Sequence, residues 1–226
     1  MDQGSRLSSR NVADLPFLLP APHAERLAAV ADIEGKIVRA LDALGPLTGR
    51  DVVVLDLPDG PLLDRFADAG IVPTRLPVVA PLRLDAPDGS CDALVSLWTG
   101  FRGVDPTELA EADRVLRPGG RLLVVHDYGR DDVSALRPTD APEYGAWSHR
   151  DGPFLRGGFK LRVIHAFWTF PTLDDARSLL REAFGEPGEQ AAAGLKRPRL
   201  SWNVAVYHRP RGGIEADAAI QPTGTA

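Results

Sequence analysis

Short, near-continuous apolar runs alternate along the chain with segments in which apolar residues recur at helical spacing. The apolar runs occupy residues 51–56, 92–97 and 121–126. Runs of this kind are typical of strands that are covered on both faces of a sheet. The helical spacing predicts helices at 23–44, from Pro61 to Gly70, and from Asp105 to about Leu116. Strands and helices that alternate over short connections indicate a parallel sheet wrapped by helices.

The second half of the chain adds late strands and a last helix. Strands are predicted at 160–168 and 200–208, and a helix from Thr172 to Gly185. Before them, residues 129–158 are rich in Gly, Pro, Asp and Arg and predict a long irregular segment. Such a segment is either a lid over a binding crevice or a surface loop held by its aromatic residues.

These elements predict one α/β domain over residues 21–209, built on a doubly wound, mostly parallel sheet with an antiparallel late strand. A tight turn is predicted at Arg117-Pro118-Gly119-Gly120, before the third apolar run. Residues 1–20 are expected to form a flexible arm. Residues 210–226 lack periodicity and are expected to form a disordered tail.

Composition excludes several classes of protein and site. The chain has 226 residues and a single cysteine, Cys91, so it has no internal disulfide and no cysteine-cluster metal site. The five histidines show no metal-ligand spacing, and we expect no metal. A net charge of −5 argues against nucleic-acid binding by bulk charge. Without a signal peptide or an apolar run of roughly 20 residues, we expect a cytoplasmic protein that does not enter the membrane.

Two adjoining segments carry a family resemblance. They read DGSCDALVSLWTGF at 88–101 and LAEADRVLRPGGRLLVV at 109–125. In order, spacing and residue type, they resemble the class I S-adenosylmethionine-dependent methyltransferases of the small-molecule type. The resemblance implies a Rossmann-like fold, S-adenosylmethionine as cofactor, and methyl transfer to a small-molecule acceptor.

The resemblance also implies a cofactor site at the ends of two strands. The family has a glycine-rich loop after its first strand, and here only the acid Asp56 and the middle glycine, Gly60, match it. The implied cofactor-binding residues are Asp56, Leu57, Pro58, Asp59, Gly60, Ser96, Leu97 and Trp98. Pro58 and Pro61 lack a backbone N–H, and Leu62 places a large side chain where the family has its last glycine. Asp56 either approaches the cofactor or caps the turn.

Two further departures concern strand two and its surroundings. The family has an acid at the end of this strand that accepts hydrogen bonds from the cofactor's ribose, whereas this chain has Arg75, which only donates. Only 36 positions separate Asp56 from Asp92, fewer than the family uses. We therefore expect the helix and the strand between strands two and four to be missing.

Other candidate residues follow the strand ends. His126 could act as a general base with Asp127 nearby, although adjacent strand residues point to opposite faces. The alternative is a structural histidine. The candidate acceptor-site residues are Thr99, Tyr128, Trp147 and His149. For Trp98 the alternative is a packed core tryptophan, and for Trp147 and His149 it is a surface loop.

Three functions therefore stay open. The first is an enzyme that transfers a methyl group from S-adenosylmethionine to an unidentified small molecule. The second is a methyltransferase-fold protein that has lost the cofactor and serves as a binding or assembly module, that is, a pseudoenzyme. The third is a nucleotide or dinucleotide binder on the same kind of sheet. A homodimer or a complex with a protein partner is compatible with each of them.

Overall fold

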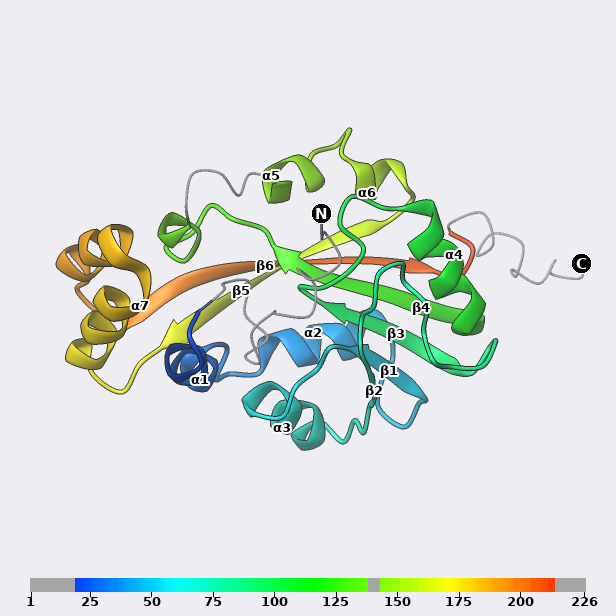
Figure 1. Ribbon diagram of the computed structural model, residues 1–226, viewed down its shortest axis with the longest axis horizontal. Helices are drawn as coiled ribbons and strands as arrows, with labels where there is room; N and C mark the ends of the chain where they lie inside the picture. The colour runs from blue at the N-terminus through cyan, green and yellow to red at the C-terminus, as the bar shows by residue number, and fades with distance from the viewer. Residues whose placement is uncertain (1–18, 138–142, 214–226) are drawn as a thin grey trace, which may run out of the picture.

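The computed structural model describes residues 19–137 and 143–213 and contains a six-stranded sheet with strand order β2-β1-β3-β4-β6-β5 (Figure 1). The strands are β1 (Val52–Leu55), β2 (Thr74–Leu76), β3 (Cys91–Leu97), β4 (Leu116–Asp127), β5 (Lys160–Thr169) and β6 (Arg199–Pro210). The first four strands pair in parallel, and β6 is antiparallel to both β4 and β5. The expected α/β fold with an antiparallel late strand is confirmed.

The connection from β2 to β3 is short. β2 and β3 lie on opposite sides of β1, so the chain must cross β1 between them. Residues 77–90, all of which are described, make this crossing without a helix or a strand. The expected absence of both elements is therefore confirmed.

Helices cover both faces of the sheet (Figure 1). One face packs against α1 (Ala21–Val30), α2 (Lys36–Leu44), α3 (Pro61–Asp68) and α7 (Leu173–Gly194). The other packs against α4 (Pro106–Val115), α5 (Glu143–Trp147) and α6 (Pro153–Arg156). Strand residues alternate between the two cores: Val54 belongs to the first, and Val53 to the second. Since both faces are buried, each central strand is apolar at almost every position.

The helix predicted at 23–44 is divided into α1 and α2. Asp32, which is buried and has a φ of 47°, separates them. Its carboxylate accepts the backbone N–H groups of Lys36 at 3.0 Å and Ile37 at 2.8 Å, which caps the start of α2. Apolar periodicity continues across the break because both helices pack on the same face of the sheet.

Three other predicted elements differ in detail. The residues of the turn at 117–120 lie within β4, where the pairing with β3 shifts between Cys91 and Ala93. The last helix breaks at Gly185, as predicted, but a second helical segment continues to Gly194. The segment at 129–158 contains α5, α6 and the short 3-10 helix η1 (Ser134–Leu136). Most of the predicted arm and tail, and part of the predicted long segment, lie outside the described residues, at 1–18, 214–226 and 138–142.

Candidate functional site

Asp56 ties together the carboxyl ends of three parallel strands. It follows β1 directly, with a φ of 49°. One carboxylate oxygen accepts the backbone N–H of Val78, after β2, at 2.8 Å. The other accepts the hydroxyl of Thr99, after β3, at 3.0 Å. In open α/β sheets, ligands bind outside this edge, so the candidate site starts from these residues.

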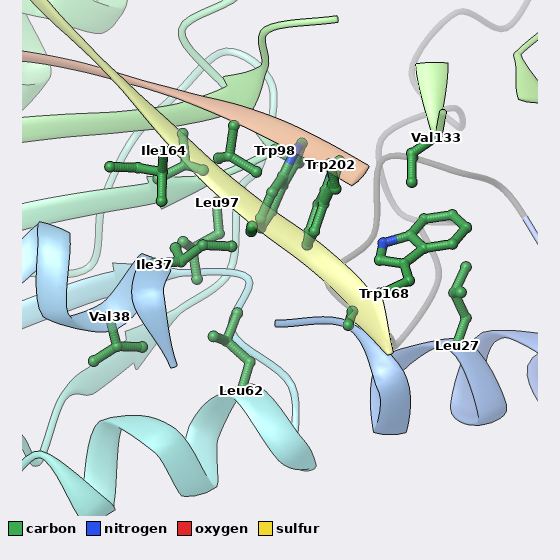
Figure 2. Packing of buried hydrophobic residues seen from close by; sticks show 14 of the residues in the cluster. Leu27, Ile37, Val38, Leu62, Leu97, Trp98, Val133, Ile164, Trp168 and Trp202 are labelled. Carbon is green, nitrogen blue, oxygen red and sulfur yellow. The ribbon is translucent and has the colours of Figure 1, made fainter. Parts of the chain in front are cut away.

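The turn between β1 and α3 is packed with side chains. Leu57 and Leu62 are only 4% and 7% exposed and belong to the first core. Leu62 points from α3 into the cluster that also contains Ile37 and Trp98 (Figure 2). Pro58 and Pro61 contribute no N–H groups to this turn. The turn therefore does not fit the close backbone approach to the cofactor that the family's glycines allow.

Arg75 lies in the middle of β2, the strand at whose end the resemblance implies a ribose-binding acid, and no Asp or Glu stands in this strand. Its guanidinium donates to the Asp59 carboxylate at 2.7 Å. Asp59, which the resemblance implies as a cofactor-binding residue, is therefore already paired with Arg75. Asp59 remains largely exposed. Neither β2 nor the β1–α3 turn thus provides a buried acid for a ribose.

The end of β3 is also part of the core. Ser96 and Leu97 are buried, and the Ser96 hydroxyl donates to the Thr99 carbonyl. Trp98 is 4% exposed and stacks on Trp202, with ring centroids 5.4 Å apart. Trp98 therefore lies in a buried aromatic stack, next to the candidate site.

His126 and Asp127 are buried on opposite sides of β4, as the strand alternation predicts. The His126 ring lies 4.7 Å from the Trp147 ring, in the second core. The Asp127 carboxylate accepts the indole N–H groups of Trp98 at 3.0 Å and Trp202 at 3.2 Å. It also pairs with Arg137. Sequence reasoning missed Arg137 and Trp202 because only the folded chain brings them to Asp127.

The four candidate acceptor-site residues are placed apart from one another. The Thr99 hydroxyl donates to Asp56, and the Tyr128 backbone N–H donates to the Asn203 carbonyl at 2.9 Å. Trp147 is 6% exposed and packs against aromatic residues of the second core, whereas His149 is exposed. None of the four lines the cavity at this edge of the sheet.

A cavity of about 380 Å³ begins at Val78, whose backbone N–H donates to Asp56. One wall is the segment from Val78 to Leu82, which follows β2. The other wall comes from the β3–α4 connection and the start of α4, through Gly100, Arg102, Asp105, Thr107 and Glu108. Sequence reasoning identified residues 105–108 only as a helix cap, and Asp105 does accept the N–H groups of Thr107 and Glu108. These residues line a cavity because the segment 77–90 crosses β1 and forms the facing wall.

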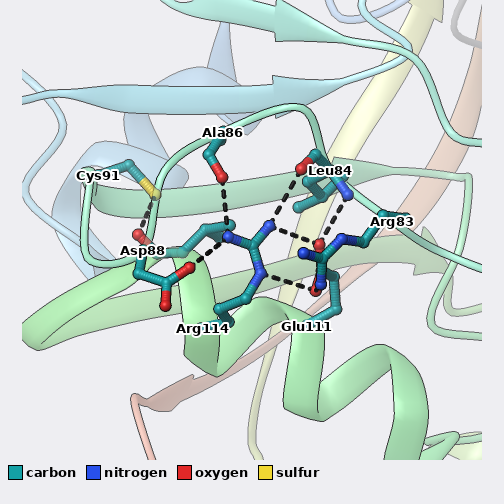
Figure 3. A network of polar contacts seen from close by, with 8 residues as sticks. Arg83, Leu84, Ala86, Asp88, Cys91, Glu111 and Arg114 are labelled. Carbon is teal, nitrogen blue, oxygen red and sulfur yellow. Dashed lines mark hydrogen bonds and ion pairs between the residues drawn. The ribbon is translucent and has the colours of Figure 1, made fainter.

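An ion-pair network holds the rest of this crossing against α4 (Figure 3). The Glu111 carboxylate accepts the Leu84 backbone N–H at 2.7 Å and pairs with Arg114 at 2.7 Å. Arg114 also donates to the Ala86 carbonyl at 2.8 Å and to Asp88 at 2.6 Å. Chiefly through Arg114, this environment lowers the pKa of Glu111 to about 2.

The described residues contain neither a cluster of metal ligands nor a membrane-spanning helix. Within residues 19–137 and 143–213, no group of three or more His, Cys, Asp or Glu residues is placed to hold a metal ion. No helix in these ranges is long and apolar enough to cross a bilayer.

Comparison with known proteins yields a curated relative. The ubiquinone/menaquinone biosynthesis C-methyltransferase of Methylobacterium nodulans is 41% identical over 177 residues. The match covers 70% of this chain and 64% of the relative, so the chain spans less than two thirds of the relative's length. No protein-family model matches the chain.

Solved structures resemble the chain more distantly. A protein assigned to the methyltransferases, from an antibiotic biosynthesis pathway of Anabaena variabilis, is 14% identical with a TM-score of 0.45, over 81% of this chain and 99% of that one. The Haemonchus contortus phosphoethanolamine N-methyltransferase 2, in complex with S-adenosyl-L-methionine, is 12% identical with a TM-score of 0.36, over 75% of this chain and 51% of that one.

The motifs at 88–101 and 109–125, the sheet of four parallel strands followed by an antiparallel one, and the curated relative agree with one another. In its sequence motifs and in its fold, the chain is similar to the class I S-adenosylmethionine-dependent methyltransferases.

Proposed function

We propose that the protein transfers a methyl group from S-adenosylmethionine to a small-molecule acceptor. The observation that carries this proposal is the 41% identity, over 177 residues, to a protein named as a C-methyltransferase. The cavity that begins at Val78 supports it, because its 380 Å³ falls in the range of small-molecule sites and it opens at the carboxyl edge of the parallel strands.

Methyl transfer depends mainly on how the enzyme positions the acceptor relative to the cofactor's methyl group. S-adenosylmethionine supplies an activated methyl group and leaves as S-adenosylhomocysteine, so an acceptor that is already nucleophilic and held in line with it needs no base. A carbon acceptor also loses the proton that the methyl group replaces, and this proton passes to water. This is consistent with His126 and Asp127, which are buried in separate cores and need no catalytic role. The relative's name makes an intermediate of ubiquinone or menaquinone biosynthesis the first acceptor to test.

Thermal unfolding with and without S-adenosylhomocysteine tests the cofactor. Ligand at about 100 times its dissociation constant stabilises the folded state by roughly 2.7 kcal/mol. For a chain of this size, we expect the midpoint to rise by roughly 5–10 °C. ATP at the same concentration is the control for nonspecific nucleotide binding and should leave the midpoint unchanged.

One observation favours a second function, that of a non-catalytic binding or assembly module. Leu57, Leu62 and Trp98 are buried at the two strand ends where the family binds its cofactor. If millimolar S-adenosylhomocysteine fails to shift the midpoint, this second function replaces the first. The search would then turn to partner proteins.

A further inference from the structure

The two sides of the cavity differ in chemistry. The segment from Val78 to Leu82 reads Val-Val-Ala-Pro-Leu and presents apolar side chains. The opposite side carries the charged residues Arg102, Asp105 and Glu108. A ligand that fits both sides has a flat apolar part and, on its other side, groups that can donate hydrogen bonds to carboxylates.

Glu108 is the carboxylate with unused bonding capacity. Its Oε2 atom is buried and has no hydrogen-bond partner within the described ranges. The other polar contact of the side chain is a hydrogen bond from the Phe101 backbone. Burial raises the pKa of Glu108, because little around the carboxylate offsets the loss of water. A buried acceptor without a donor is costly, and a ligand that donates to it removes that cost.

The neighbouring charged residues are already engaged. Asp105 Oδ1 accepts two N–H groups, from Thr107 at 2.7 Å and from Glu108 at 3.2 Å. The Arg102 guanidinium lies 5.8 Å from the centre of the Trp147 ring. Of the two carboxylates that line the cavity, Glu108 is the one with a buried oxygen that has no hydrogen-bond partner among the described residues.

The chain lacks such an acceptor where the family it resembles has one. Strand β2 carries Arg75, which has only donors and pairs with Asp59. The cavity begins at Val78, two residues beyond the end of β2, so Glu108 faces the same space from the opposite wall.

We propose that this cavity binds the adenosine part of S-adenosylmethionine and that Glu108 accepts hydrogen bonds from the ribose hydroxyls, in place of the acid missing from β2. The inference rests on the proposed function. In this arrangement the adenine lies against the apolar wall from Val78 to Leu82. The binding site has shifted from the glycine loop and β2 to the first turn of α4.

Calorimetric titration with S-adenosylhomocysteine tests the role of Glu108. Hydrogen bonds to a charged group contribute enough that we expect Glu108→Gln and Glu108→Ala to weaken binding roughly 10- to 100-fold. Asp85→Asn is the matched control: it removes one negative charge from an exposed residue that lines a neighbouring hollow, and it should change binding less than about twofold. Ligand-free thermal unfolding verifies that each variant is folded.

An analogue without ribose hydroxyls, 2′,3′-dideoxy-S-adenosylhomocysteine, separates a direct contact from a structural role. Wild type should prefer the parent compound, and Glu108→Ala should lose that preference, because the coupled partners are then both absent. If Glu108→Ala weakens both ligands equally, or weakens neither, the assignment of Glu108 is overturned while the proposed function stands. If wild type binds neither ligand at millimolar concentration, both proposals fail.

Discussion

The two turns at the carboxyl edge of the sheet differ in what fills them. After β1, the backbone turns through Asp56 and Gly60, and leucine side chains occupy the space beside it. After β3, the chain runs into α4 and leaves a cavity of about 380 Å³ against residues 78–82. A glycine loop keeps space open for a ligand, and leucines close it in favour of core packing.

The cavity after β3 depends on the short connection between β2 and β3. Without a helix and strand between β2 and β3, residues 77–90 cross β1 and pack against α4. That crossing forms the cavity wall and is held by the Glu111–Arg114 network (Figure 3). The proposed site at Glu108 would place the binding groups on a different part of the same edge.

The largest expected effect on stability comes from removing Arg114, which holds the crossing segment beside the cavity against α4. Arg114→Met leaves Glu111, which is 6% exposed, without its main partner, so we expect a loss of about 3–5 kcal/mol in the free energy of unfolding. Arg83→Met is the matched control: Arg83 also pairs with Glu111, at 3.1 Å, but is 73% exposed and should cost less than about 1 kcal/mol. Urea unfolding measures both, and equal losses would show that the network does not anchor the crossing.

The next largest effect concerns the turn between β1 and α3, which leucine side chains fill. Leu62→Ala should lower the free energy of unfolding by about 2–4 kcal/mol, because it leaves a cavity in the first core. Val79→Ala, in the wall of the cavity after β3, should change it by less than about 0.5 kcal/mol because Val79 is 58% exposed. If Leu62→Ala is harmless and tightens binding of S-adenosylhomocysteine, the turn is a site rather than a core.

Lowering the pH should change the stability contributions of two carboxylates on α4, Glu111 and Glu108, in opposite directions. The pKa of Glu111 is lowered to about 2, so its contribution to stability is present above pH 4.5 and is lost as the pH falls from 4.5 towards 2. By pH 3 the loss amounts to about 2 kcal/mol relative to Glu111→Gln, measured by urea unfolding. A wild type and variant with parallel pH profiles would contradict this.

Glu108 should show the opposite sign. Its pKa is raised by burial, so the folded state holds the proton more tightly and loses stability as the pH rises from 4.5 through the raised value. Without ligand, Glu108→Gln should therefore be at least as stable as wild type at neutral pH. A clear loss of stability would mean that the carboxylate has a structural partner.

The smallest effect is a chemical one at the opposite edge of the sheet. Cys91 begins β3, is 1% exposed, and burial raises the pKa of its thiol to about 11. We expect a maleimide to leave the native protein unlabelled at neutral pH and to label it after unfolding in urea. Rapid native labelling would show that this end of β3 opens in the folded protein.

Much of the fold was accessible from the sequence. The continuous apolar runs predict buried parallel strands, and the 36 positions between Asp56 and Asp92 predict the missing elements. The site was less accessible. Glu108 reads as part of a helix cap, and Trp98 reads equally well as a pocket wall or as core.

The sequence by itself determined the order of elements, the buried faces and the loss of the family's glycines and ribose acid. These depend on local periodicity, on the absence of a Cβ or an N–H, and on chain length, all of which are written in neighbouring residues. Only the tertiary structure decided that Leu62 and Trp98 pack into a core, that Asp127 meets Trp202, and that Glu108 faces Val78–Leu82 across a cavity. Contacts between residues far apart in the chain depend on how strands pair and on which side the chain crosses, so no local pattern encodes them.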